Sequence, residues 1–208
     1  ASCKLDLGDI YLLNKLPWEA TLLYSQVEKD NSNTAIGQDA KFRNAKFSYF
    51  TGDFDFAKSQ LTVLKSATSQ LIANDALNLS LLISDNLQSE TDTNALKKYA
   101  YADMLLFKNQ PDKALSTLDS IDAQYHDHSL ADDMLMTKAR IFLAKNDLNT
   151  SIVQLQKIID NYIPSTSDNE RAWYLQEMAR YSYNEKRTAS IEYQSTADYV
   201  KVNVENQT

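Results

Sequence analysis

The sequence predicts an all-α protein, an α-solenoid of antiparallel helix pairs with about 10 helices. Its 208 residues include only 3 glycines and 3 prolines, fewer than the turns of an all-β or doubly wound fold require. Hydrophobic residues make up 43% of the chain and charged residues 24%, which is typical of a folded protein with its own core. The third observation is an internal repeat of amphipathic helical patterns, whose apolar faces are covered when neighbouring units stack.

Small residues recur at two fixed positions of this repeat. In the second helix of each expected pair, they are Ala20, Ala57, Ala114 and Ser151. Twelve residues earlier, in the first helix, they are Gly8, Ala45, Ala102 and Ala139. Successive members are 37, 57 and 37 residues apart. Small side chains at both positions allow the two helices of a pair to approach closely, and the longer middle spacing indicates one inserted helix.

Larger apolar residues follow each small residue of the second helices at helical spacing. Four residues later the chain has Tyr24, Leu61, Leu118 and Leu155. Seven residues later it has Val27, Leu64, Ile121 and Ile158. Residues four and seven positions apart lie on one helix face, so we expect both sets to fill the space toward neighbouring units.

The helix boundaries follow from this pattern. Helices are expected at residues 4–14, 17–29, 38–51, 54–66, 71–87, 93–108, 111–123, 129–145, 148–161 and 168–184. They form pairs near 4–29, 38–66, 93–123 and 129–161, with extra helices at 71–87 and 168–184. Together these helices make one repeat array over residues 1–184. Residues 185–208 break the pattern, and we expect a frayed helix or a tail there.

Turn and capping residues mark the joints inside each pair. In the first pair Pro17 opens the second helix, where a missing N–H leaves no hydrogen bond unmade, and Pro111 does the same in the third pair. In the second pair Gly52 marks the turn, and in the fourth pair Asn146 does. Each joint therefore carries its own stop and start signal.

The inserted helix at 71–87 is apolar on most sides, so we expect it to be sandwiched between neighbours. Two sequences then resemble helix starts of the capping-box type, with Asp in place of the usual Glu. These are Ser89-x-x-Asp92 and Ser129-x-x-Asp132. They predict helices that begin close to residues 89 and 129.

The pattern Leu7-Gly8-x-x-Tyr11, followed by Ala20-x-x-x-Tyr24, resembles the tetratricopeptide repeat. That repeat reads W-x2-L-G-x2-Y and then A-x3-F, and Lys4 stands where it has Trp. The repeat here is 37 residues, longer than the family's, which implies longer loops. The resemblance covers roughly residues 4–184 and implies a stacked superhelix of helix pairs.

Two longer runs resemble bacterial members of this family. Residues 18–29 with 40–46 are similar to tetratricopeptide proteins of Bacteroidota. Residues 125–133 with 161–164 resemble inter-repeat segments of outer-membrane assembly lipoproteins and periplasmic Tol-Pal coordinators. The resemblance implies the bacterial periplasm or cell envelope, with the cytoplasm as the alternative. We also expect the chain to be the processed or incomplete part of a longer array.

In tetratricopeptide arrays the first helix of each pair lines the concave face, so the resemblance implies a partner-binding surface there. Carried over column by column, that surface includes Phe42, Arg43, Lys46, Tyr49, Tyr99, Asp103 and Arg140. Aromatic residues between charges of alternating sign could anchor a peptide. The alternative for any one of these aromatic residues is a place in the core. Leu5, Asp6 and Asp9 in the first pair argue against the subclass that clamps the carboxyl termini of chaperones.

The expected function is a non-enzymatic scaffold or adaptor that binds another protein or peptide. The alternative is a structural subunit of a larger cell-envelope complex. A net charge of −7 argues against nucleic acid as a partner, because such proteins need a basic surface. No apolar run approaches the roughly 18 residues of a membrane span. The oligomeric state stays open.

Few residues suggest chemistry, and we expect no catalytic site and no cofactor. His126 and His128 stand among aspartates, where they could bind a metal ion such as zinc, or could lie in a solvated loop that caps the next helix. Ala1-Ser2-Cys3 resembles the end of a lipoprotein signal, but cleavage there would remove Ala1 and Ser2. We therefore interpret Cys3 as an ordinary helix residue.

Overall fold

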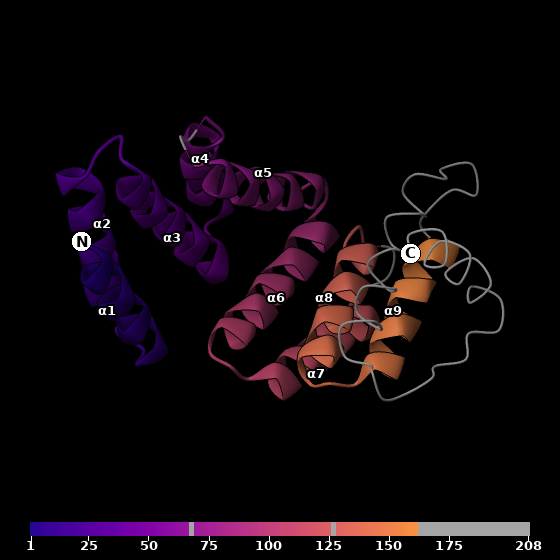
Figure 1. Cartoon of the computed structure of the whole chain (residues 1–208). Helices are drawn as coiled ribbons and strands as arrows, with labels where there is room; N and C mark the ends of the chain where they lie inside the picture. Colours follow the sequence, from indigo (N-terminus) through magenta and orange to yellow (C-terminus); the bar gives the residue numbers. More distant parts are fainter. Residues whose placement is uncertain (67–68, 126–127, 162–208) are drawn as a thin grey trace, which may run out of the picture. The chain divides into compact units, whose positions relative to one another are not determined.

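The structure is a computed structural model that describes residues 1–66, 69–125 and 128–161, and these form nine α-helices without a strand (Figure 1). The helices are α1 (Ser2–Leu13), α2 (Pro17–Asp30), α3 (Ala35–Thr51), α4 (Phe54–Leu64), α5 (Gln70–Asp85), α6 (Glu90–Phe107), α7 (Pro111–Gln124), α8 (Ala131–Ala144) and α9 (Leu148–Asn161). The prediction of an all-α chain is confirmed for this part. The expected helix at 168–184 and the tail at 185–208 lie outside the described residues.

The helices divide between two compact bodies. The N-terminal body, Ala1–Leu130, contains α1 to α7, and the C-terminal body begins at Ala131 with α8 and α9. Within these bodies α1 packs on α2, α3 on α4, α6 on α7 and α8 on α9, as the expected helix pairs require. The helices α2, α3, α4 and α5 also pack in sequence, and α3 contacts α6.

Local hydrogen bonds account for three of the helix starts. Helix α3 begins three residues before the expected range, because the side chain of Thr34 accepts a hydrogen bond from the N–H of Gly37. Helix α6 begins where the Ser89-x-x-Asp92 pattern predicts it and three residues before the range 93–108, because Ser89 caps it by accepting from the N–H of Asp92. The helix predicted to begin near Ser129 begins at Ala131, and the hydroxyl of Ser129 bonds across to Asn86.

All eight small repeat residues are buried. At Gly8 a side chain would stand only 2.4 Å from Cε1 of Tyr24, so the α1–α2 contact requires glycine there. In the fourth pair, the hydroxyl of Ser151 donates to the carbonyl oxygen of Ala139 at 2.8 Å, which joins the two small positions directly. The larger apolar residues four and seven positions later are buried as well. The repeat read from the sequence thus corresponds to a repeated packing contact.

The turn inside each pair also repeats. Left-handed φ values occur at Lys15 (61°), Gly52 (81°), Asn109 (53°) and Asn146 (61°), which are separated by the same 37, 57 and 37 residues. In the first turn, the N–H of Lys15 donates to the carbonyl oxygen of Leu12, and the next N–H donates to Tyr11. The other three turns have the same two hydrogen bonds, which define a Schellman motif.

The inserted helix α5 differs from its prediction. It buries Ala76, Ser80 and Ile83 along one face, while Leu71 is 71% exposed and Leu81 is 47% exposed. The expectation that α5 is sandwiched between neighbours is therefore wrong. The physical reason is that only α4, with a smaller contribution from α3, covers it extensively among the described helices.

Candidate interaction site

The seven residues predicted for partner binding fall into three groups. Tyr49 and Tyr99 are only 1% and 5% exposed and belong to the core of the N-terminal body. Lys46 is exposed on α3, and Arg140 is exposed on α8 in the C-terminal body. The remaining three are half-buried and are Phe42, Arg43 and Asp103. The exposed part of the predicted partner-binding surface is thus formed by charged residues more than by the two tyrosines.

Arg43 is the centre of a polar network that joins the first three helices. Its Nη1 lies 2.5 Å from Oδ2 of Asp9, and its Nε and Nη2 donate to the two carboxylate oxygens of Asp39 at 3.2 and 3.1 Å. The hydroxyl of Tyr24 donates to the other oxygen of Asp9 at 2.6 Å. Burial and the contact with Asp9 raise the pKa of Tyr24, which therefore stays a hydrogen-bond donor. Arg43 is thus engaged in holding α1 and α2 to α3.

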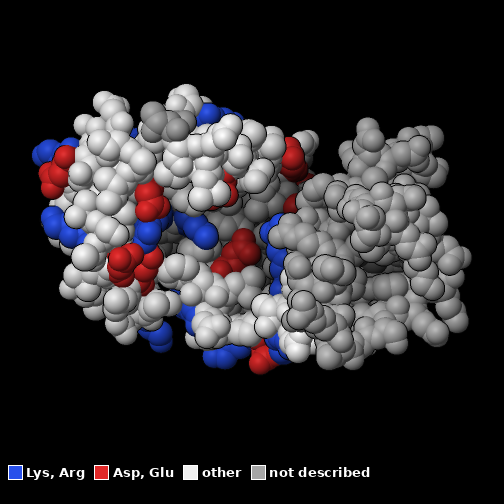
Figure 2. Space-filling view, viewed as in Figure 1, with Lys and Arg blue, Asp and Glu red and all other residues white. Residues whose placement is uncertain are grey.

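A second link joins α3 to α6 beside this network. The hydroxyl of Tyr49 donates to Oδ2 of Asp103 at 2.8 Å, and the Tyr49 ring lies 6.0 Å from that of Phe54 between centroids. The three first helices α1, α3 and α6 are therefore held together by side-chain contacts. Figure 2 shows acidic and basic side chains side by side on the visible face of the N-terminal body, without one broad patch of either sign.

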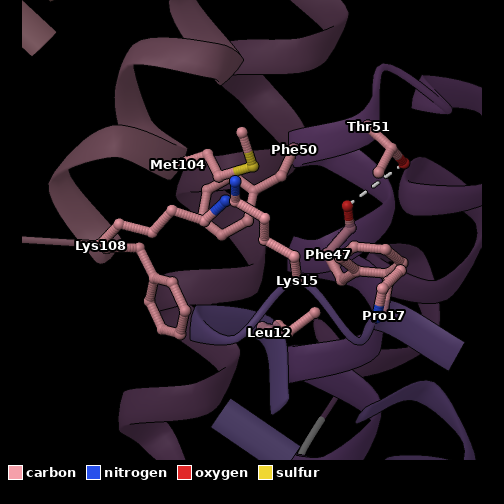
Figure 3. Close-up of a pocket in the computed structure, with 9 residues that line it drawn as sticks. Leu12, Lys15, Pro17, Phe47, Phe50, Thr51, Met104 and Lys108 are labelled. Carbon is pink, nitrogen blue, oxygen red and sulfur yellow. Dashed lines mark hydrogen bonds between the residues drawn. The ribbon is translucent and has the colours of Figure 1, made fainter. Parts of the chain in front are cut away.

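A pocket that the sequence did not predict lies at the C-terminal ends of these three helices. Its volume is about 250 Å³. It is lined by Leu12, Lys15, Pro17, Phe47, Phe50, Thr51, Met104, Phe107 and Lys108 (Figure 3). Apart from the two lysines and Thr51, every lining side chain is apolar. We call it the α1–α3–α6 pocket.

Two lysines line this pocket, and neither has a partner among the residues that the structure describes. In Figure 3 the side chains of Lys15 and Lys108 reach toward one another beside Met104 and Phe50. Neither ammonium group makes a hydrogen bond or ion pair with another residue in the described ranges. By contrast, Lys41 on the same body pairs with Glu28 at 3.0 Å.

Two further features give the pocket its character. The Nζ atom of Lys46 lies 5.7 Å from the centroid of the Phe50 ring, which places a third cation near the pocket. Phe50 and Phe107 stand with their ring centroids 5.8 Å apart and tilted by 43°. The pocket therefore combines an aromatic and aliphatic lining with nearby positive charge.

The repeat contains the signal that could have found this pocket. Phe47 and Met104 occupy one repeat position in α3 and α6, and Phe50 and Phe107 occupy another. Both columns are apolar in α3 and α6. An apolar column on the outer side of successive first helices indicates a shared apolar surface. The corresponding residue Ile10 in α1 is half exposed.

The contacts of His128 are structural. His128 is buried, its Nδ1 accepts from the N–H of Leu130, and its Nε2 lies 3.4 Å from Oδ1 of Asp122. His126 lies outside the described residues. Across the described ranges, no group of three or more His, Cys, Asp or Glu side chains could hold a metal ion. Cys3 is exposed on α1.

Comparison with known proteins identifies no family for this chain. No protein-family model, no curated protein and no solved structure matches it. Among the described helices, none has both the length and the apolar character that a membrane crossing needs.

Proposed function

We propose that this chain is a non-enzymatic scaffold of the tetratricopeptide type, which binds a segment of another protein across the face of α1, α3 and α6. The observation that carries the proposal is the α1–α3–α6 pocket, whose two lysines have no partner within the described part of the chain. It lies on the first helices of three pairs, where the family resemblance implies partner binding. Interfaces of this kind use apolar anchors in a pocket with polar groups at the rim.

The rest of the face supports this proposal. Arg43 and Asp9 link α1 to α3, and Tyr49 and Asp103 link α3 to α6, so the pocket is formed before any partner arrives. A preformed pocket lowers the ordering cost of binding. Exposed Lys46 extends the charged surface beyond the pocket itself.

Cross-linking mass spectrometry in the source cells tests this function. We expect cross-links from one partner to concentrate on Lys15, Lys46 and Lys108, with few at Lys29 and Lys58. The last two are exposed on α2 and α4 and serve as controls in the same body. Cross-links distributed equally over all five lysines would contradict binding at this face.

A second candidate is a structural subunit of a larger cell-envelope complex. It is favoured by an exposed apolar surface on α1 and α2, where Trp18 is 83% exposed and Leu22 is 58% exposed. Ile10 and Leu13 on α1 are also exposed. Large exposed apolar patches mark interfaces, and permanent ones are the more hydrophobic. Stable copurification of several partners, with Trp18 protected from solvent quenching in the assembly, would support this candidate.

The proposed compartment is the bacterial periplasm or cell envelope, with the cytoplasm as the alternative. It is supported by the resemblance of residues 18–29 and 125–133 to envelope proteins of this class. Fractionation of the source cells, with the chain followed by an antibody, tests it. Recovery with the cytoplasmic fraction alone would reject the envelope location.

A further inference from the structure

We propose that the α1–α3–α6 pocket accepts one bulky apolar side chain of a partner peptide while Lys15 and Lys108 bind a carboxylate beside it. This inference rests on the proposed function and specifies the chemistry of the partner. The recognised segment would carry Leu, Phe or Trp within one or two residues of Asp or Glu.

The size and lining of the pocket fit one side chain. Its volume of about 250 Å³ is below the roughly 300–1,000 Å³ of sites that enclose a drug-sized ligand or cofactor. Phe47, Phe50, Met104 and Phe107 supply aromatic and thioether surfaces. Such surfaces pack favourably against an aromatic or branched aliphatic group. No carboxylate lines the pocket to favour a basic ligand.

The charges at the pocket fit a carboxylate. Lys15 and Lys108 reach toward one another (Figure 3), no carboxylate of the described residues pairs with either, and two like charges that converge repel. A bound carboxylate would relieve that repulsion through charge-assisted hydrogen bonds. The whole chain carries a net charge of −7, so the local positive charge at the pocket is opposite in sign to the charge of the protein.

The backbone of Lys15 is a second and independent observation. Its φ of 61° lies in the left-handed region, which a lysine disfavours. The equivalent residues of the other three turns are Gly52, Asn109 and Asn146, which tolerate that region better. Only the first turn has a long cation there, and that cation lines the pocket. Strained backbone of this kind is typical of functional positions.

A peptide selection tests the proposal. Random peptides displayed on phage are selected on the full chain, and enriched peptides are measured by fluorescence anisotropy. We expect an enriched pattern with a bulky apolar residue beside Asp or Glu. Changing that acid to Lys should weaken binding by roughly tenfold or more.

Two variants separate binding from folding. Lys15→Gly removes the cation but suits the left-handed backbone, so the fold should be at least as stable while binding weakens roughly tenfold. Lys108→Glu should weaken binding further. Lys58→Glu, an exposed lysine on α4, is the matched control and should leave binding unchanged.

Several results would overturn the proposal. Enriched peptides that bind Lys15→Gly and Lys108→Glu as tightly as the parent would exclude the pocket, although cross-links on the same face would still uphold the proposed function. A selection that enriches basic peptides, or none, would also overturn it. If no peptide is enriched, and decanoate binds the parent more tightly than Lys15→Gly and Lys108→Glu, the pocket would instead be a fatty-acid site. A failure of the proposed function would be detected separately, by cross-links that do not concentrate on Lys15, Lys46 and Lys108.

Discussion

Helix α7 buries its apolar residues against a partner helix, whereas α5 packs as a single helix and leaves several leucines exposed. Ala114 and Leu118 of α7 are fully buried. On α5, Leu81 is 47% exposed, and the buried hydroxyl of Ser80 has no hydrogen-bond partner among the described residues. Both helices have apolar residues at helical spacing, so the difference comes from their surroundings. A helix of a pair meets a matched surface, and an inserted helix does not.

The largest expected effect comes from truncating leucines in the two helices. Leu118→Ala should lower the free energy of unfolding by about 2–5 kcal/mol, because it leaves a cavity between α6 and α7. Leu81→Ala on α5 should cost less than about 1 kcal/mol, since that side chain is already half in water. Urea denaturation followed by circular dichroism measures both. Equal losses would show that α5 is as well packed as α7.

Overpacking the small repeat position should have the next largest effect. Ala114→Leu should lower the free energy of unfolding by about 1–3 kcal/mol, because the α6–α7 contact has no room for the added atoms. Ala57→Leu should do the same between α3 and α4. Ala123→Leu, at an exposed position of α7, is the control. If the two buried variants melt like this control, the small columns do not set the helix spacing.

The repeated turn gives a smaller effect. Gly52→Ala should destabilise the chain by about 1–2 kcal/mol, because φ is left-handed there. The added Cβ would meet the Lys97 side chain at an ordinary 3.5 Å, so the cost is conformational and not steric. Gly52→Asn should cost less, since Asn tolerates this region. A larger loss for Asn than for Ala in thermal unfolding would contradict this reason.

The two buried serines give effects of opposite sign. Ser80→Ala in α5 should raise the free energy of unfolding by about 1 kcal/mol, because it removes a buried hydroxyl without a partner. Ser151→Ala in α9 should lower it by about 1 kcal/mol, because that hydroxyl donates to Ala139. Chemical denaturation of the two variants, each compared with the parent, measures the difference. The same sign for both would remove this distinction between α5 and the pairs.

The smallest effect concerns pH at the joint after α5. The hydroxyl of Ser89 donates to Asp92, and so do the backbone N–H and the hydroxyl of Ser129. These hydrogen bonds hold the pKa of Asp92 below the ordinary 3.8. A lowered pKa means that Asp92 stabilises the fold above pH 3.8 and that this contribution is lost as the pH falls through the folded pKa. The parent and Asp92→Asn should therefore differ in urea midpoint at neutral pH and converge in acid. A difference that persists or grows in acid would contradict the assignment.

Part of the candidate site could be predicted from the sequence. The family resemblance predicts that Lys46 lies on the surface of α3, and it is exposed there. Tyr49 and Tyr99 have the same helical phase as surface residues of the first helices, but neighbouring helices cover them. Periodicity states which side of a helix a residue occupies and not which neighbour lies on that side. The repeat columns of Phe47 and Phe50 indicate an apolar surface, but the pocket combines three helices far apart in sequence, and their meeting is not part of that pattern.

The helix pairs and their turns follow from local sequence signals. A small residue such as Ala57, a stop such as Gly52 and an opening proline such as Pro111 act within one or two helices, where spacing alone describes the geometry. That α5 is covered on one face, and that Lys15 and Lys108 share a pocket, follows from tertiary contacts. Burial and the pairing of charges depend on which helices meet, and those contacts join residues separated by most of the N-terminal body.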